Sequence, residues 1–252
     1  MTNRTIFSFL AAMILALDVS AACAGQQDPL YYRRTLFVPV GERMLVLEAP
    51  VEMCFFDRTE YAQHILHDQL KEQMDQKHKE SALAFFMPCL DLAAIEGGQT
   101  PSEPLPVLGS VSWLNPMIGE ETKMPRAEYL DMRETSFRDY GLGKINDFHA
   151  DALKADKKTG DETGMTASLF DPEKYKFDDS VHRTENGISL GYTSDVDFNY
   201  QKYHVDGILA TTVIRRIPVE FSLRYAGQET HDTAALRALM DKFVAQQITL
   251  NE

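Results

Sequence analysis

The sequence predicts an α+β fold, a mostly antiparallel sheet of about six to seven strands with helices on both faces. Apolar residues recur at alternate positions in 188–200 and in 217–225, which is the period of a strand with one buried face. Residues 205–214 are apolar on both faces and predict a central strand that is covered on both sides. Only Arg215 and Arg216 separate the last two strands, so their pairing must be antiparallel.

The elements are predicted in the order ββ-α-ββ-α-βββ-α. The first two strands, Thr35–Val40 and Arg43–Glu48, are separated by Gly41 and Glu42, a pair that suits a type II′ hairpin turn. Pro39 then belongs on an edge strand, where its missing N–H does no harm.

Asp57 and Glu60 resemble a capping box that opens a helix reaching about Lys79. Its apolar stripe is predicted at helical spacing, at Ala62, Ile65, Leu66, Leu70 and Met74. The elements predicted after it are strands at Ala82–Met87 and Val107–Leu114, a helix from Pro125 to about Tyr140, and a final helix that Asp232 caps. Residues 141–186 are polar and predict an excursion with mobile flanks and a short helix near 147–157.

The N-terminus predicts an export signal over residues 1–24, followed by one domain over 25–252. Arg4 precedes an apolar run from Ile6 to Leu17, which is too short for a membrane-spanning helix and suits a signal peptide. Ala22-Cys23-Ala24 is a cleavage site of the A-x-A kind, with Val19-Ser20-Ala21 as an earlier possibility. Cys23 could instead carry a lipid anchor, but Ser20 stands where that processing prefers a large aliphatic residue.

The composition excludes two classes of partner. The net charge is −13, and the leader holds one residue of each sign, so its removal leaves this charge unchanged. Nucleic acid and anionic membrane surfaces both require clustered positive charge, so neither is a predicted partner. No second long apolar segment follows the leader, and none of the remaining chain is predicted to span a membrane.

Cleavage after Ala24 leaves two cysteines, Cys54 and Cys89. Two cysteines in an oxidising compartment most often pair, and these flank the first helix and the strand after it. We therefore predict one intramolecular disulfide, which requires a Cα separation of roughly 4.4–6.8 Å. Two separate buried thiols are the alternative.

The chain resembles a group of exported bacterial proteins whose fold is similar to the PsbP-like α/β/α sandwich. The resemblance rests on Cys54-Phe55-Phe56-Asp57, on Phe86-Met87-Pro88-Cys89 and on Arg126-Ala127-Glu128-Tyr129-Leu130-Asp131. The closing strand pair and the helix that ends at Asn251 add to it. PsbP-like proteins are mostly accessory or binding proteins, so the resemblance implies no catalytic residues.

Gly187-Ile188-Ser189-Leu190-Gly191 matches G-x-S-x-G, the nucleophile elbow of serine hydrolases. An elbow requires a strand-to-helix turn, whereas here a long alternating strand follows. Ser189 is therefore predicted on the polar face of that strand. His231 with Asp195 or Asp206 would complete a triad only by coincidence.

His64, His67 and Asp68 lie one turn apart on the first helix, a spacing that could hold a metal with help from Glu60 or His78. No glutamate stands where a zinc hydrolase needs one, so we interpret these histidines as part of a solvated helix face. Asp195-Val196-Asp197 lacks a calcium loop. Gly141-Leu142-Gly143-Lys144 lacks the rest of a phosphate loop. The aromatic series Tyr192, Phe198 and Tyr200 is predicted to be sheet core.

The sequence thus favours a non-catalytic accessory or binding protein of the bacterial envelope, whose partner is an envelope protein or a small ligand. No catalytic residue, cofactor or metal is predicted. The alternative is a secreted hydrolase that uses Ser189, or a metal enzyme that uses His64 and His67.

Overall fold

The structure is a computed structural model that describes residues 34–78, 81–99, 106–113, 122–139, 176–178, 180–198 and 201–252. The predicted export signal, Cys23, the Gly141–Lys144 motif and the short helix near 147–157 lie outside these residues. Within them, no helix has both the length and the apolar character that are needed to cross a membrane.

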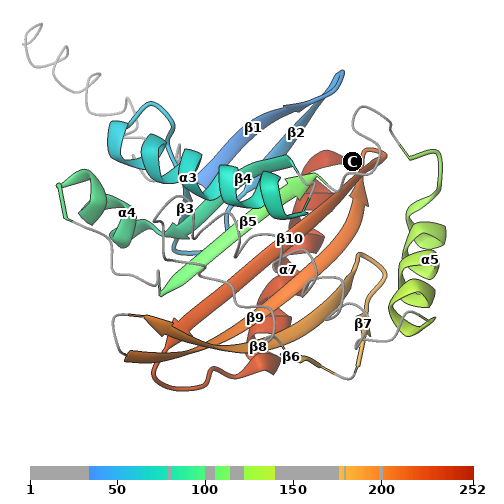
Figure 1. Cartoon of the computed structure of the whole chain (residues 1–252). Helices are drawn as coiled ribbons and strands as arrows, with labels where there is room; N and C mark the ends of the chain where they lie inside the picture. Colours follow the sequence, from blue (N-terminus) through green and yellow to red (C-terminus); the bar gives the residue numbers. More distant parts are fainter. Residues whose placement is uncertain are drawn as a thin grey trace, which may run out of the picture. The chain divides into compact units, whose positions relative to one another are not determined.

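The main sheet has eight strands and is antiparallel at each of its pairings (Figure 1). Its order is β3-β4-β5-β10-β9-β8-β6, with β7 also beside β8. The strands are β3 (Met53–Phe55), β4 (Ser81–Pro88), β5 (Val107–Trp113), β6 (Lys176–Phe177), β7 (His182–Arg183), β8 (Ile188–Phe198), β9 (Gln201–Ile214) and β10 (Ile217–Gly227).

A separate two-stranded sheet is formed by β1 (Thr35–Val40) and β2 (Arg43–Glu48). The described helices are α3 (Tyr61–His78), α4 (Cys89–Glu96), α5 (Arg126–Asp139) and α7 (Thr233–Asn251). The α+β prediction is confirmed. The prediction missed β3, α4 and the short strands β6 and β7, which lie at the end of the supposed polar excursion.

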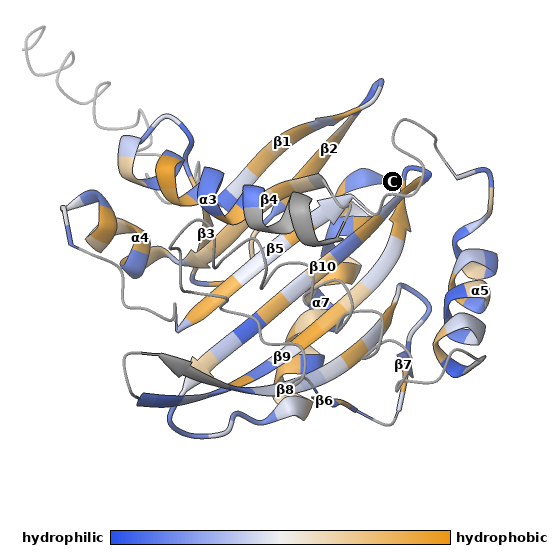
Figure 2. Cartoon of the chain, viewed as in Figure 1, coloured by the Kyte–Doolittle hydropathy of each residue, from blue (hydrophilic) through white to orange (hydrophobic). Residues whose placement is uncertain are grey.

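The two faces of the sheet are covered by different elements. One face packs against α7 and the β1–β2 hairpin in the largest core cluster, which includes Phe86, Phe221 and Phe243. The other face packs against α3 and α4 around Phe85 at one end, and against α5 around Tyr129 at the other. The apolar bands along the strands in Figure 2 reflect these contacts.

The turns follow the predicted chemistry. Gly41 has a φ of +60° while Glu42 has none in the positive range, the pattern of a type II′ turn. Arg215 and Arg216 have φ values of +47° and +68°, so both central residues of the β9–β10 turn are left-handed, as a type I′ turn requires. The cost of the left-handed backbone at Arg215 is offset, because its guanidinium donates hydrogen bonds to the carbonyls of Met44 and Asn251.

The buried face of α3 differs from the predicted one. Leu70 is buried as predicted, but Ile65 and Ala62 are exposed, and the polar Gln63 and His67 are buried instead. Gln63 accepts a hydrogen bond from the Asp57 N–H at 2.6 Å and donates to Glu96 of α4. Asp57 does not cap the helix: its carboxylate accepts from Thr59, and α3 begins only at Tyr61.

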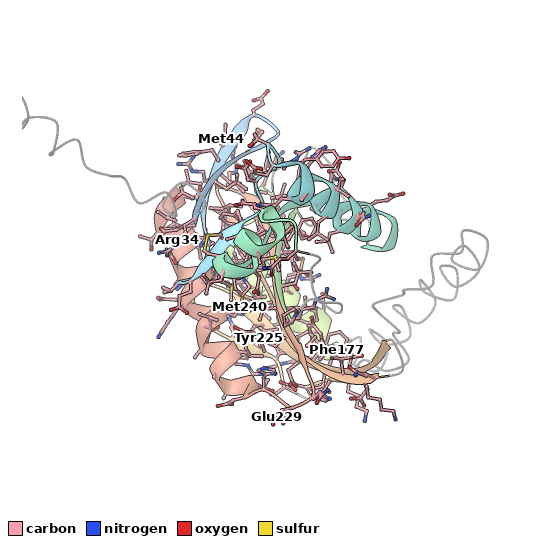
Figure 3. The ribbon with its side chains drawn as sticks, turned by 90° about the vertical axis from the view of Figure 1, so that its left-hand side faces the viewer. Arg34, Met44, Phe177, Tyr225, Glu229 and Met240 are labelled. Carbon is pink, nitrogen blue, oxygen red and sulfur yellow. A yellow bond between two sulfur atoms is a disulfide. The ribbon has the colours of Figure 1, made fainter. Side chains whose placement is uncertain are left out.

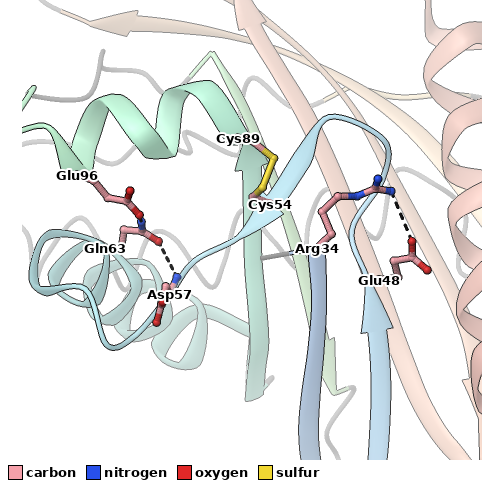
Figure 4. Close-up of a disulfide and its surroundings, with 7 residues drawn as sticks. All are labelled: Arg34, Glu48, Cys54, Asp57, Gln63, Cys89 and Glu96. Carbon is pink, nitrogen blue, oxygen red and sulfur yellow. Dashed lines mark hydrogen bonds and ion pairs between the residues drawn. A yellow bond between two sulfur atoms is a disulfide. The ribbon is translucent and has the colours of Figure 1, made fainter. Parts of the chain in front are cut away.

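The predicted disulfide is confirmed. Cys54 of β3 is bonded to Cys89, the first residue of α4, with a Cα–Cα distance of 4.9 Å (Figure 4). Cys54 has no exposed surface and packs in the cluster around Phe85. The bond therefore ties an edge strand to a helix that the sequence did not predict, and it does so beside the Gln63 bridge.

The hairpin is held by two side-chain amides of α7. Asn251 accepts from the Val46 N–H at 2.9 Å and donates to the Val46 carbonyl at 2.7 Å. Gln247 makes the same pair of bonds with Glu48, both at 2.9 Å. Four helical residues rise about 6 Å and two strand residues about 6.6 Å, so amides at i and i+4 match alternate backbone groups of β2.

Candidate functional site

A strip of polar side chains crosses the middle of the sheet, on the face that carries α3, α4 and α5. We call it the polar strip and define it as Ser110, Ser112, Glu220, Ser222 and Arg224. Glu220 pairs directly with Ser112, and Ser222 with Ser110, so adjacent strands send these side chains to the same face. Ser110, Ser112 and Arg224 are buried, whereas Glu220 and Ser222 remain partly exposed.

The strip lies between two apolar regions. On the β4 side its neighbours are Ala82 and Phe85, and on the β9 side Leu209. The region around Phe85 packs against α3 and α4, whereas Leu209 packs beside Tyr192 and Phe177 of the neighbouring strands, and the strip occupies the two strands between these regions. Polar side chains at the centre of a sheet cost free energy unless they meet partners, so their clustering there indicates a purpose other than packing.

A glycine brings a further hydroxyl to the strip. The side chain of Tyr192 reaches across β9 over Gly207, where a Cβ atom would stand 2.1 Å from the ring. The Tyr192 hydroxyl is thereby hydrogen-bonded to Ser222. On the other side of Glu220, Thr211 of β9 is hydrogen-bonded to Tyr129 of α5, with 3.2 Å between their oxygens.

Burial raises the pKa of Glu220 to about 7, and the positive charge of Arg133 on α5 lowers it in part. The carboxyl group is therefore both a donor and an acceptor near neutral pH. Together with the hydroxyls and Arg224, it offers a polar ligand a row of alternating hydrogen-bonding groups about 13 Å long on β10. This arrangement suits the binding of a polar ligand, because donors and acceptors lie side by side along it.

We expect Glu220→Gln to change how stability depends on pH. The folded pKa is raised, so the folded state holds its proton more tightly, and stability falls as pH rises from about 4.5 to about 7. Glutamine has no charge to bury. The free energy of unfolding of the variant minus that of the wild type should therefore be about 2 kcal/mol larger at pH 8 than at pH 5. Urea unfolding at both pH values measures this gain. Glu128→Gln, on the exposed side of α5, is the control, and parallel profiles for Glu220→Gln and wild type would contradict the assignment.

Ser189 is not on a solvated face, contrary to the prediction. It is buried on the face that packs against α7, and its Oγ has no hydrogen-bond partner among the described residues. In the pairing of β7 with β8, Ser189 is opposite His182. The Nε2 atom of His182 lies 2.9 Å from Oδ2 of Asp241 on α7. His231 lies beside Asp206 and not beside Ser189. Asp206 pairs with Thr193 of β8, which is four residues along the strand from Ser189.

A serine, a histidine and an aspartate thus approach one another, but not as a triad. The serine hydroxyl is not bonded to the imidazole and is shielded from solvent, and a strand rather than a helix follows it as far as Phe198. A nucleophile elbow needs a sharp turn that exposes the hydroxyl, together with backbone donors for the oxyanion. The G-x-S-x-G match is therefore part of an ordinary strand.

We expect Ser189→Ala to raise the free energy of unfolding by about 1 kcal/mol, because it removes a buried hydroxyl that has no partner. Thr212→Val is the matched control: Thr212 is equally buried, but its hydroxyl donates to the Asn186 carbonyl, so this change should destabilise. Thermal unfolding of both variants measures the two opposite shifts. A loss of stability in Ser189→Ala would show that its hydroxyl does have a partner.

The histidines of α3 share one carboxylate. His64 Nε2 lies 3.4 Å and His67 Nδ1 3.1 Å from the Asp68 carboxylate. His67 corrects the prediction of a solvated helix face: it is buried, with its ring edge against Phe85 at 5.3 Å, and burial lowers its pKa. No group of three metal-ligating side chains occurs within the described ranges.

A second histidine cluster closes the end of the sheet. His204 lies between Asp195, at 2.8 Å, and the buried Asp206, at 3.2 Å. The hydrogen bond to Asp195 raises the pKa of His204. Asp206 also accepts the backbone N–H of His231 at 2.6 Å, which holds the loop before α7. Asp195 therefore has a structural role, because it pairs with the histidine that also contacts Asp206.

Sequence reasoning identified Glu220, Ser222 and Arg224 only as the polar half of an alternating strand. Alternation alone did not single them out, because the neighbours of β10 are set by the strand order β5-β10-β9. Tyr192 was predicted to be core, and it is buried in contact with Phe177. The side chains of Phe198 and Tyr200 lie outside the described set.

Comparisons with known proteins add little to this geometry. The chain matches no protein family and no curated protein sequence. Among solved structures it is similar to LpqN of Mycobacterium tuberculosis, described as involved in cell envelope biogenesis. The two share 9% sequence identity with a TM-score of 0.28, over 88% of this chain and 83% of LpqN. A likeness this weak carries no argument, and the resemblance to PsbP-like proteins stays a prediction.

Proposed function

We propose that the protein is an exported, disulfide-bonded accessory or binding protein of the bacterial envelope, and that it has no catalytic activity. The observation that carries this proposal is the Cys54–Cys89 bond. Structural disulfides form and persist in oxidising compartments such as the periplasm, and they are rare in the reducing cytoplasm. The leader over residues 1–24 supplies the route, with release into the periplasm or the medium after Ala24.

The polar strip supports the binding part of the proposal. It gathers hydroxyls, a carboxyl group with a pKa of about 7 and a guanidinium on one face of two adjacent strands. Such a set orients a polar ligand by hydrogen bonds, and none of its members is poised to form a bond with the ligand.

Two measurements on protein from native cells test the export. Mass spectrometry should find a chain that begins at Ala22 or Gly25, and alkylation before reduction should modify neither Cys54 nor Cys89. A lipidated Cys23 would instead indicate an anchored form. An intact Met1 together with two reactive thiols would overturn the proposal.

A secreted hydrolase is the second candidate, because Ser189, His182 and Asp241 lie together on one face. A fluorophosphonate probe separates the two. The binding proposal expects no labelling of the folded wild type, whereas labelling that Ser189→Ala abolishes would establish the hydrolase. The metal alternative at His64 and His67 gains no support, because among the described residues these histidines and Asp68 do not form a group that could hold a metal ion.

A further inference from the structure

The two edges of the β1–β2 hairpin are unequal. On β2, the backbone groups of Met44, Val46 and Glu48 point away from β1, and Arg215, Asn251 and Gln247 satisfy them. The odd-numbered residues of β2 therefore bond to β1, and their register partners are even-numbered. The backbone bond from Ala49 to Arg34 continues the same parity.

The odd-numbered residues of β1 consequently direct their backbone groups to the opposite edge. The N–H groups of Thr35 and Phe37 and the carbonyls of Thr35, Phe37 and Pro39 have no hydrogen-bond partner among the described residues. Pro39 lacks only an N–H that would point outwards. Pro39 removes one donor from this edge, but the groups of Thr35 and Phe37 can still pair with another strand.

The side chains along this edge are also exposed and apolar. Phe37 is 64% exposed and Met44, the partner of Pro39 on the outer side of the hairpin, 45%. Thr35–Val40 contains no charged residue, although the chain as a whole carries −13. In Figure 3 Met44 lies near the turn of the hairpin and Arg34 at its base.

We propose that the outer edge of β1 pairs with the same edge of a second copy of this chain, as antiparallel strands centred on Phe37. In this register Phe37 faces Phe37 of the copy, Thr35 faces Pro39, and about four backbone hydrogen bonds form. In this register Arg34, whose guanidinium lies 3.5 Å from the Glu48 carboxylate of its own hairpin, is opposite Val40 of the copy and two residues from Glu42 in the copy's turn, so opposite charges approach each other at both ends. The paired strands carry no charged residue, so no like charges face each other along the pairing itself.

The assembly closes at two copies. Pairing uses up the β1 edge of each hairpin, and α7 already covers the β2 edge, so no further strand can add to this sheet. Six residues and a few apolar side chains bury less area than a standard interface of about 1,600 Å². The dimer is therefore weak, and its population depends on concentration.

Sedimentation velocity of the purified chain tests the proposal. The apparent mass of the wild type should approach double between about 10 μM and about 1 mM. Phe37→Glu and Phe37→Lys place like charges opposite each other, so each should stay monomeric, while an equal mixture of the two should recover the dimer. Because Phe37 is exposed, both variants should keep the circular dichroism spectrum of the wild type.

Leu90→Glu is the matched control, since Leu90 is 84% exposed on α4 and should leave the dimer intact. A wild type that stays monomeric up to about 1 mM would overturn the proposal. The same holds for a dimer that Phe37→Glu leaves unchanged, or for one that Leu90→Glu abolishes equally.

Discussion

Replacing Cys54 by alanine is expected to lower the free energy of unfolding by about 2–5 kcal/mol. The disulfide closes a loop between residues 35 positions apart, so its loss frees the unfolded chain to occupy many more conformations. The folded state loses less, because β3 still pairs with β4 and Cys89 N–H still donates to the Glu52 carbonyl. Urea unfolding under oxidising conditions, with the slope compared as well as the midpoint, measures the effect.

Reduction provides the control for this prediction. Wild type in excess dithiothreitol should unfold at the same urea concentration as the Cys54→Ala, Cys89→Ala double variant. The double variant also removes the free Cys89 thiol, which could otherwise cross-link two chains. If reduced and oxidised wild type unfold together, the bond contributes nothing to stability, and this prediction is wrong.

The C-terminal half of the fold could be predicted because its residues carry their own signals. The alternation in β8 and β10, the two apolar faces of β9 and the two arginines between β9 and β10 each restrict the chain to one local structure. Asp232 was predicted to cap the last helix, and it does accept the Ala234 N–H at 2.9 Å. Local pattern and tertiary packing agree here, which is why the prediction succeeds.

The first helix shows where such reasoning fails. The apolar stripe through Ile65 was more regular than the face that is buried, because Gln63 and His67 are polar. Gln63 is buried since its amide links Asp57 to Glu96, and Glu96 belongs to α4, which the sequence did not reveal. The face of a helix depends on its partners, so an error in α4 became an error in α3.

The candidate site was missed for a related reason. Alternation shows that Glu220 and Phe221 lie on opposite faces of β10, but it does not show which strands flank β10. Only the strand order places Ser110 and Ser112 next to Glu220 and Ser222. Conversely, the G-x-S-x-G match at Ser189 is contiguous and conspicuous, yet it lies in a buried strand. Local motifs and three-dimensional clusters are independent kinds of information.

Asn251→Asp is expected to destabilise the protein by about 3 kcal/mol or more at pH 7. The aspartate keeps the size of the side chain and the oxygen that accepts the Val46 N–H. It replaces the amino group that donates to the carbonyls of Val46 and Gln247 with an oxygen, so a buried negative charge faces two acceptors. The hairpin would lose one of its two amide attachments to α7, which loosens the packing of its inner residues Leu45 and Leu47.

The pH dependence separates this mechanism from a general loss of packing. A carboxylate in this position has its charged form disfavoured, so its folded pKa rises and the folded state gains protons as pH falls. The protonated acid can donate to a carbonyl again, and most of the lost stability should return at about pH 4 relative to wild type. Asn251→Leu cannot recover in this way, because it has no proton to gain.

Thr249→Ala, on the exposed side of the same helix, should change stability little at either pH. Hydrogen exchange at the Val46 N–H should accelerate in Asn251→Asp at pH 7 more than exchange at Phe221, which would place the defect in the hairpin. If the deficits of Asn251→Asp and Asn251→Leu are equal at both pH values, the paired amide bonds are not what holds β2 to α7.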